Sequence, residues 1–188
     1  MHAATFRPQQ GMTLVEVLVT VVILAIGLLG LVGLQARLQV LQVESYQRAQ
    51  ALMLLKDMAG RIANNRNHAA AYVTTAPLGT GMNCPTSTAT RQAADVAEWC
   101  RLLQGASEAT GGGAQVGAMI GGRGCVQSLG SGQYMVTVAW QGMAPISAPP
   151  VTVTCALNQY NGTGPGAVCQ NDLCRRVVTT IVRIADLT

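Results

Sequence analysis

Two pairs of acidic residues and one histidine could support acid–base chemistry. Asp95 and Glu98 lie three residues apart, and Asp172 and Asp186 lie near the C-terminus. Two carboxylates can divide the roles of general acid and general base, whereas a Ser-His-Asp arrangement would have to use His68. His68 lies among Asn and Ala residues, and we interpret the acidic residues as solvated surface or helix-end groups. The sequence therefore predicts no enzyme activity and no cofactor.

The cysteines form the second set of reactive side chains. All six lie in the C-terminal part of the chain: Cys84, Cys100, Cys125, Cys155, Cys169 and Cys174. An even number in this position favours disulfides in an oxidising compartment. Zinc or free buried thiols are the alternatives, but no C-x-x-C pair is present. Six cysteines allow fifteen pairings. Proximity favours Cys84–Cys100 and Cys169–Cys174, which leaves Cys125–Cys155.

Glycine and arginine clusters offer weaker signals. The segment 111–124 is rich in glycine but lacks the G-K-[ST] ending of a phosphate loop, so we interpret it as a flexible surface insertion. Arg175 and Arg176 could contact an acidic partner, although a solvated strand edge is the simpler reading. The triplet Asn161-Gly162-Thr163 fits a glycosylation site and is interpreted as a turn. The net charge of +4 is small and dispersed, so no nucleic-acid partner is expected.

The stretch around which the chain is organised is the apolar run from Gly11 to Leu34. From Val17 onward it contains no charge, and its length suits a membrane-spanning helix, which needs roughly 17–25 residues. Glu16 is the exception, and an ionisable group in such a place usually has a partner. No A-x-A cleavage site follows, so the run should remain as an anchor. Arg7 indicates a cytoplasmic N-terminus.

The run should continue as one helix. Apolar residues three or four apart continue to about residue 63, which predicts a helix over 12–63 with a transmembrane first half over about 12–34. Three glycines three residues apart, Gly27, Gly30 and Gly33, either serve close helix packing or are neutral filler, and a helix break at Gly33 is the further option.

The remainder, 64–188, is expected to be a periplasmic or extracellular globular domain. A short helix is predicted over 90–104, and β propensity predicts strands at about 133–141, 150–156 and 175–185. Strands that follow one another in sequence favour an antiparallel meander. The fold class is therefore α+β, with the helix first.

The order Gly11-Met12-Thr13-Leu14-Val15-Glu16 before an apolar run resembles the class III signal of type IV prepilins and type II secretion pseudopilins. The resemblance implies a leader, residues 1–11, that a prepilin peptidase removes after Gly11. Met12 would become the N-methylated terminus, although the family usually has Phe there. Glu16 would then correspond to the Glu that the family keeps at the fifth position of the mature chain, and it would pair with a neighbour's terminal amine during subunit assembly. It also implies a pilin-like lollipop, in which the long helix packs on the sheet.

Further segments resemble the PilV group of minor pilins, namely the helix end ALMLLKDMAGRIANN, the strand YMVTVAW and the start of the last strand, RRVV. The resemblance implies a minor pilin that helps to initiate type IV pilus assembly and supports twitching motility and surface attachment. Its partners would be other minor pilins, the major pilin and a non-pilin tip adhesin. It would reside in the inner membrane and then at the pilus tip. The alternative is a minor pseudopilin of type II secretion, and a DNA-uptake pilin is less favoured.

Overall fold

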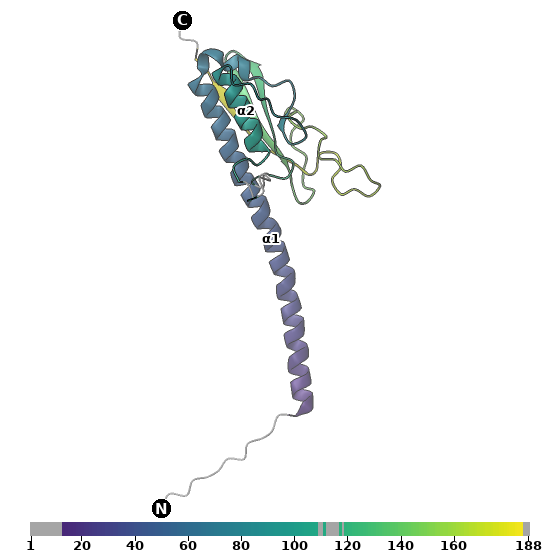
Figure 1. Cartoon of the computed structure of the whole chain (residues 1–188). Coiled ribbons are helices and arrows are strands. Elements are labelled where there is room, and N and C mark those ends of the chain that lie inside the picture. The colour runs from purple at the N-terminus through teal and green to yellow at the C-terminus, as the bar shows by residue number, and fades with distance from the viewer. Residues whose placement is uncertain (1–12, 109–110, 112–116, 118, 186–188) are drawn as a thin grey trace, which may run out of the picture. The chain divides into compact units, whose positions relative to one another are not determined.

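The computed structural model describes residues 13–108, 111, 117 and 119–185. The chain divides into two units, residues 1–42 and residues 43–188, which we describe separately. Within the described residues the elements follow the order α1, η1, β1, α2, β2, β3, β4 (Figure 1). The long helix comes first and the antiparallel sheet later, which confirms the α+β prediction.

The first unit contains the N-terminal part of helix α1, which spans Leu14–Asn64. Thr13 precedes the helix and accepts hydrogen bonds at its carbonyl oxygen from the backbone N–H groups of Glu16 (3.1 Å) and Val17 (3.3 Å). Its hydroxyl oxygen also accepts from the Glu16 N–H at 3.4 Å, as expected of an N-cap. The helix continues through Gly33 without the break that the sequence left open.

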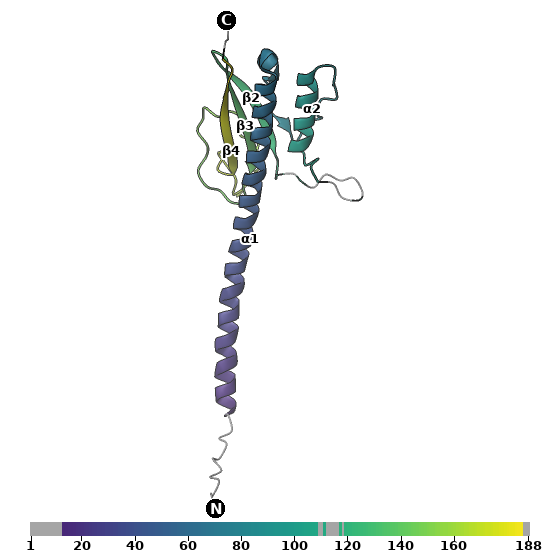
Figure 2. The same cartoon turned by 90° about the vertical axis from the view of Figure 1, so that its left-hand side faces the viewer.

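The second unit is built on one four-stranded antiparallel sheet. Its strands are β1 (Leu78–Gly79), β2 (Arg123–Gly130), β3 (Gln133–Gln141) and β4 (Arg175–Arg183), paired in the order β1-β2-β3-β4. The tight turn between β2 and β3 places Gly130, Ser131 and Gly132 at positive φ, where glycine costs least. Figure 2 shows the three longer strands side by side.

The main core lies between one face of this sheet and two helices. The 3-10 helix η1 (Arg66–Tyr72) follows α1, and α2 spans Arg91–Leu103 with Thr90 as its N-cap. The C-terminal part of α1, η1, α2 and the sheet contribute the principal buried side chains: Ala51, Leu54, Leu55, Met58, Ile62, Tyr72, Trp99, Leu103, Val126, Val136, Val138 and Trp140. The indole N–H of Trp99 donates to the Leu54 carbonyl oxygen at 2.9 Å, so α2 is tied to α1 by a buried hydrogen bond.

The opposite face of the sheet has a smaller core. Cys125 and Ala139 of the sheet contact Cys155, Ala156 and Tyr160. The segment that supplies the last three residues was predicted to be a strand over 150–156, and that prediction is wrong, because residues 151–160 form turns and irregular backbone. Pro149 and Pro150 precede it, and the Cys125–Cys155 disulfide attaches it to the face of the sheet rather than to an edge.

Residues 150–156 were expected between the strands at 133–141 and 175–185, but β3 pairs directly with β4, and strand β2, which the sequence did not predict, pairs with the other side of β3. The first residues of β2 come from the glycine-rich segment that we interpreted as a flexible surface insertion, and for residues 121–124 that interpretation is wrong. Gly124 is buried in the sheet, where an added Cβ would collide with the Trp99 ring and lie 2.7 Å from Leu103 Cδ1. Glycine is therefore present here because α2 packs tightly against the strand.

Candidate assembly site

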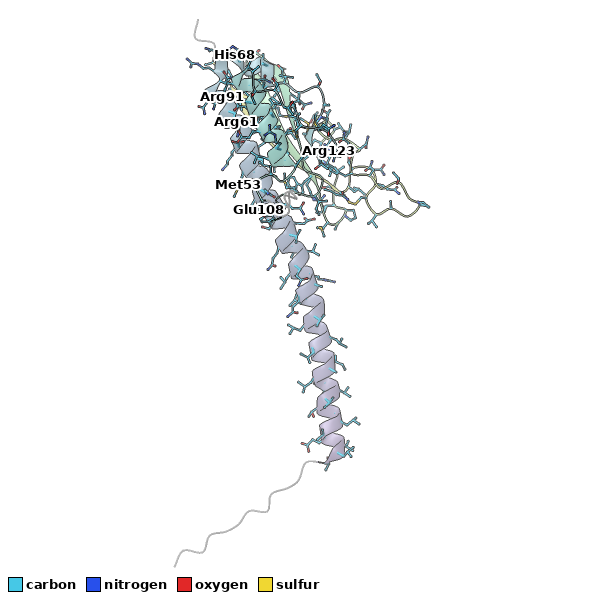
Figure 3. All side chains as sticks on the ribbon, viewed as in Figure 1. Met53, Arg61, His68, Arg91, Glu108 and Arg123 are labelled. Carbon is cyan, nitrogen blue, oxygen red and sulfur yellow. A yellow bond between two sulfur atoms is a disulfide. The ribbon has the colours of Figure 1, made fainter. Side chains whose placement is uncertain are left out.

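The N-terminal part of α1 exposes an almost uninterrupted apolar surface. Its large aliphatic side chains from Leu14 to Leu34 are between 44% and 81% exposed, and Figure 3 shows such side chains projecting from the helix. An 18-residue window has a mean hydropathy of 2.9 and none of it is buried. By length and composition, this helix can cross a membrane.

Two polar side chains interrupt this surface, and the structure treats them differently. The Thr20 hydroxyl donates to the Val17 carbonyl oxygen at 2.8 Å, so its donor is satisfied within the helix. Glu16 lies in the first turn and is exposed, and no side chain among residues 13–108 or 119–185 forms an ion pair with its carboxylate. A carboxylate in apolar surroundings needs a cation, and residues 13–108 and 119–185 supply none to Glu16. Gly11 and Met12, the predicted cleavage site, lie outside the described residues.

Three glycines in the N-terminal part of α1 leave part of this surface flat. A Cβ added at Gly27, Gly30 or Gly33 would meet no atom within 4 Å, and Gly30 and Gly33 line a shallow groove with Leu34 and Arg37. Small residues allow helices in apolar surroundings to approach closely. The groove can therefore accept a neighbouring helix.

Asp95 and Glu98 belong to an ion-pair network instead of forming an acid–base pair. The Arg61 guanidinium contacts Asp57 (2.8 Å), Asp95 (3.1 Å) and Glu98 (2.8 Å). The prediction that Asp95 is solvated is wrong, because Asp95 is only 4% exposed. Arg61 lies on α1 and the last two carboxylates lie on α2, so the network clamps the two helices together. Figure 3 labels Arg61 beside Arg91 of α2.

Tyr72 completes this network from η1. Its hydroxyl donates to Asp95 Oδ2 at 2.5 Å and accepts from the Asn65 amide at 3.0 Å. Burial opposes ionisation of Asp95, but hydrogen bonds from Tyr72, Arg61 and Arg91 outweigh it and hold the pKa of Asp95 below its ordinary value. Burial and the Asp95 carboxylate raise the pKa of Tyr72. The network is thus suited to holding a charge pair in place, not to transferring protons.

Arg175 is a structural residue, which corrects our reading of it as part of a solvated edge. Its side chain is 1% exposed, and its Nη1 donates to the carbonyl oxygens of Val153 (2.7 Å) and Cys155 (3.1 Å). Its Nε lies 3.1 Å from Asp172 Oδ2. Asp172 is itself buried, whereas Asp186 lies outside the described residues. Arg175 therefore fixes the irregular segment that covers the second core.

Arg176 turns to the other face of β4. It donates to the carbonyl oxygens of Leu173 (3.0 Å) and Ala144 (2.6 Å) and lies 3.7 Å from the Glu44 carboxylate. Neither arginine is thus a free contact for an acidic partner. Sequence reasoning missed this role because the carbonyl acceptors, except that of Leu173, lie 20 or more residues away in the chain.

Three disulfides join Cys84 to Cys100, Cys125 to Cys155 and Cys169 to Cys174. This is the pairing that proximity in the sequence favoured. The first ties the loop before α2 to α2 itself, and the last closes the turn that precedes β4.

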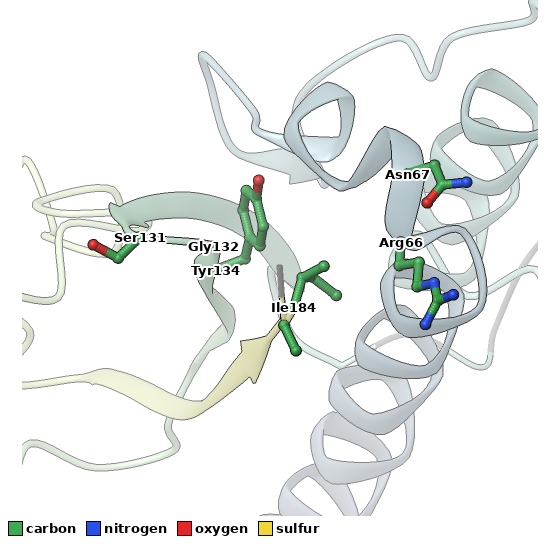
Figure 4. Close-up of a pocket in the computed structure, with 7 residues that line it drawn as sticks. Arg66, Asn67, Ser131, Gly132, Tyr134 and Ile184 are labelled. Carbon is green, nitrogen blue, oxygen red and sulfur yellow. The ribbon is translucent and has the colours of Figure 1, made fainter. Parts of the chain in front are cut away.

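A hollow of the second unit lies where η1, the β2–β3 turn and the end of β4 meet. Arg66, Asn67, Ser131, Gly132, Tyr134, Ile184 and Ala185 line it (Figure 4). Among the described residues that line it, Arg66 alone is charged, and His68, on the same 3-10 helix, is exposed. Among the residues that the structure describes, no group of three His, Cys, Asp or Glu side chains could hold a metal ion.

Comparison with known proteins is informative at the N-terminus. Residues 6–32 match the family model described as prokaryotic N-terminal methylation motif, which spans the predicted cleavage site, Glu16 and most of the apolar run. No curated protein and no solved structure matches the chain. The motif, together with the exposed apolar helix and the disulfide-containing sheet unit, supports a protein of the type IV pilin or pseudopilin type.

Proposed function

We propose that this chain is a minor pilin of the PilV group, which helps to start type IV pilus assembly and thereby supports surface attachment and twitching motility. The observation that carries the proposal is Glu16, a lone exposed carboxylate in the first turn of an apolar helix, five positions after the glycine of the methylation motif. Such a subunit has a structural role rather than a catalytic one. Its proposed domains are a leader (1–11), a helix with a transmembrane part (about 12–34) and a periplasmic unit (64–188).

The proposed mechanism begins with removal of the leader by a prepilin peptidase. Cleavage after Gly11 creates a positively charged amine at Met12, which is then N-methylated. In apolar surroundings an unpaired amine and an unpaired carboxylate are both costly, and pairing them across two subunits removes both costs together. Glu16 therefore acts as the register for insertion next to another pilin. We propose the inner membrane as the site of this step, with other minor pilins, the major pilin and a tip adhesin as partners.

The processing step can be tested by mass spectrometry of the protein purified from cells with an active prepilin peptidase. We expect the mature chain to start at N-methylated Met12. A peptidase-deficient strain is the control and should yield the chain from Met1. A chain that starts at Met1 in both strains, or one cut after Leu34, would contradict the proposal.

The assembly step can be tested with Glu16→Gln, which keeps the shape and removes the charge. We expect a processed, membrane-inserted subunit that is absent from sheared filaments, because the Met12 amine of its neighbour stays unpaired. Glu16→Asp retains the charge on a shorter side chain and should recover part of the incorporation. Equal incorporation of the wild type and Glu16→Gln would refute the pairing.

A minor pseudopilin of a type II secretion system is the alternative, because the same N-terminal motif serves both kinds of assembly. Deletion of the gene separates the two. Loss of surface filaments and twitching with normal protein secretion supports the minor pilin. Loss of secretion with intact filaments supports the pseudopilin.

A further inference from the structure

The outer edge of β4 carries backbone groups that no described residue pairs with. The register of β4 against β3 is uniform. The N–H group of Gly142 donates to the Cys174 carbonyl oxygen, and the N–H group of Ile184 donates to the Gly132 carbonyl oxygen, each at 2.8 Å. Residues that exchange hydrogen bonds alternate along an antiparallel pair. The even-numbered residues from 174 to 184 therefore face β3, and the odd-numbered residues direct their N–H and C=O groups away from the sheet.

Four of these outward residues form a continuous free edge: Val177, Thr179, Ile181 and Arg183. No backbone or side-chain group within residues 13–108 or 119–185 hydrogen bonds to their outward N–H or C=O groups. Thr179, Ile181 and Arg183 are exposed, and the Ile181 side chain is 47% exposed. The outermost position of β4 in the sheet is visible in Figure 2.

Between Val177 and Val182 this edge lacks the features by which proteins usually prevent edge pairing. Charged side chains, proline, bulges and short length are the common protections. Residues 177–182 are six consecutive β-branched residues without a charge or a proline, and the register with β3 shows no bulge. The opposite edge strand of the sheet, β1, is two residues long. A nine-residue strand of this kind is a template for a further strand.

We propose that the outer edge of β4 binds an extended segment of another protein, which adds a fifth strand to the sheet. The segment has uncharged, mainly β-branched residues opposite Val177, Thr179 and Ile181, and Asp or Glu opposite Arg183. Charge complementarity favours a segment of a different protein over strand β4 of a second copy of this chain. Strand β4 contains three arginines and no carboxylate, so a second β4 cannot supply the counter-ion for Arg183.

The proposal goes beyond the proposed function, since it concerns the sheet and not the membrane helix. It applies equally to a pilus and to a secretion pseudopilus. Hydrogen bonds from four free residues would provide the affinity, and the arginine at the end of the edge would fix the register of the incoming strand.

The first test is amide hydrogen exchange of the full-length protein in detergent micelles. We expect the amides of Thr179 and Ile181 to exchange about 100-fold faster than those of Thr180 and Val182, because only the latter are bonded to β3. Equal, slow exchange at all four positions would mean that the chain already covers its own edge, and it would overturn the proposal.

The second test places a photo-crosslinking amino acid at Ile181 in cells that produce the whole assembly. A second strain carries it at Leu129, which is 50% exposed on β2 and away from the β4 edge. We expect a cross-link from position 181 to a partner segment with the stated composition, and none to that segment from position 129. A cross-link to a second copy of this chain, or no cross-link to protein, would overturn the proposal.

Charge exchange then tests the specificity. Arg183→Glu should reduce the cross-link from position 181 at least about tenfold, and replacing the partner's acidic residue with lysine should restore it. Thr179→Pro should also reduce it, because proline removes an outward N–H and no bond to β3. Formation of all three disulfides serves as the folding control. A cross-link that both variants leave unchanged would refute strand addition.

Discussion

At the scale of single residues, the Arg61–Asp95–Tyr72 cluster shows that a charged residue of a kind usually found at the surface can stabilise the fold when it is buried and paired. Asp95 is almost inaccessible and is held by three charged or polar donors from α1, η1 and α2. A buried ion pair adds little compared with an apolar contact, but breaking it leaves one charge without compensation. The cluster therefore makes the relative position of the two helices sensitive to one carboxylate.

Asp95→Asn should lower the free energy of unfolding by about 3 kcal/mol at neutral pH, because Arg61 loses a buried partner. The pKa of Asp95 is depressed. The stabilisation that the ionised Asp95 gives the folded protein is therefore complete above about pH 4 and is lost as the pH falls through the lowered pKa. The acid-induced loss of stability should be correspondingly smaller in the variant. Denaturant unfolding of the full-length protein in micelles, followed across this pH range, measures both effects.

Glu98→Gln is the matched control for that experiment. Glu98 contacts the same Arg61, but its side chain is 60% exposed. The expected loss is below about 1 kcal/mol. Equal losses in the two variants would show that burial of Asp95 does not decide the strength of the pair.

Gly124 is the residue at which the packing of α2 is most demanding. Gly124→Ala should destabilise the protein by about 1–3 kcal/mol, because the added methyl group collides with the Trp99 ring. Gly60→Ala is the control, since its Cβ would meet no atom within 4 Å and lies in helix α1. It should be stabilising by about 0.5–1 kcal/mol. Thermal unfolding compares the two, and a neutral Gly124→Ala would contradict the tight contact.

At the scale of elements, disulfides attach segments that form no helix or strand to the rest of the fold. The segment 151–160 has no strand, and it is held on the sheet by the Cys125–Cys155 disulfide and by Arg175. The Cys169–Cys174 disulfide closes a much shorter loop, with a sequence separation of 5 compared with 30. The two disulfides should therefore contribute different amounts to the free energy of unfolding.

Replacing Cys125 and Cys155 by serine should lower the free energy of unfolding by about 3–4 kcal/mol, and replacing Cys169 and Cys174 by about 2 kcal/mol, because a longer loop loses more entropy when it is closed. Urea unfolding of both double variants under identical conditions tests the order. A larger loss for the shorter loop would show that contacts in the native state, rather than loop length, decide the effect.

At the scale of the whole molecule, the chain divides into a unit whose surface is apolar and a unit that has its own core. All buried residues of α1 lie at or beyond Gln47, within the second unit. The apolar side chains of the first unit are exposed to whatever surrounds them. The two units should therefore respond differently to detergent.

A chain that starts at Val43 and is exported to the periplasm should stay soluble without detergent and form all three disulfides. The full-length protein should partition into a detergent phase. Phase separation and thiol titration measure the two properties. A truncated chain that still enters the detergent phase would show that the second unit has a membrane-binding surface of its own.

The sequence by itself determined the features that depend on local pattern. The long helix, the short helix over 90–104 and the strands at about 133–141 and 175–185 were predicted from hydrophobic periodicity and β propensity, and the structure contains all four, the last one ending at Arg183. Glu16 could be singled out because a charge is conspicuous in an apolar run. These signals are contained in a few neighbouring residues, so no knowledge of the rest of the chain is needed to read them.

Only the tertiary structure decided which segment completes the sheet. The glycine-rich residues 121–124 look flexible in isolation, but Arg123 and Gly124 pair with β3 as the start of β2, and the Trp99 ring leaves no room for a side chain at Gly124. Residues 151–155 have strand propensity but are covered by Arg175 and tied by a disulfide. The burial of Asp95 and the free edge of β4 likewise depend on segments far apart in the chain, whose packing no local pattern encodes.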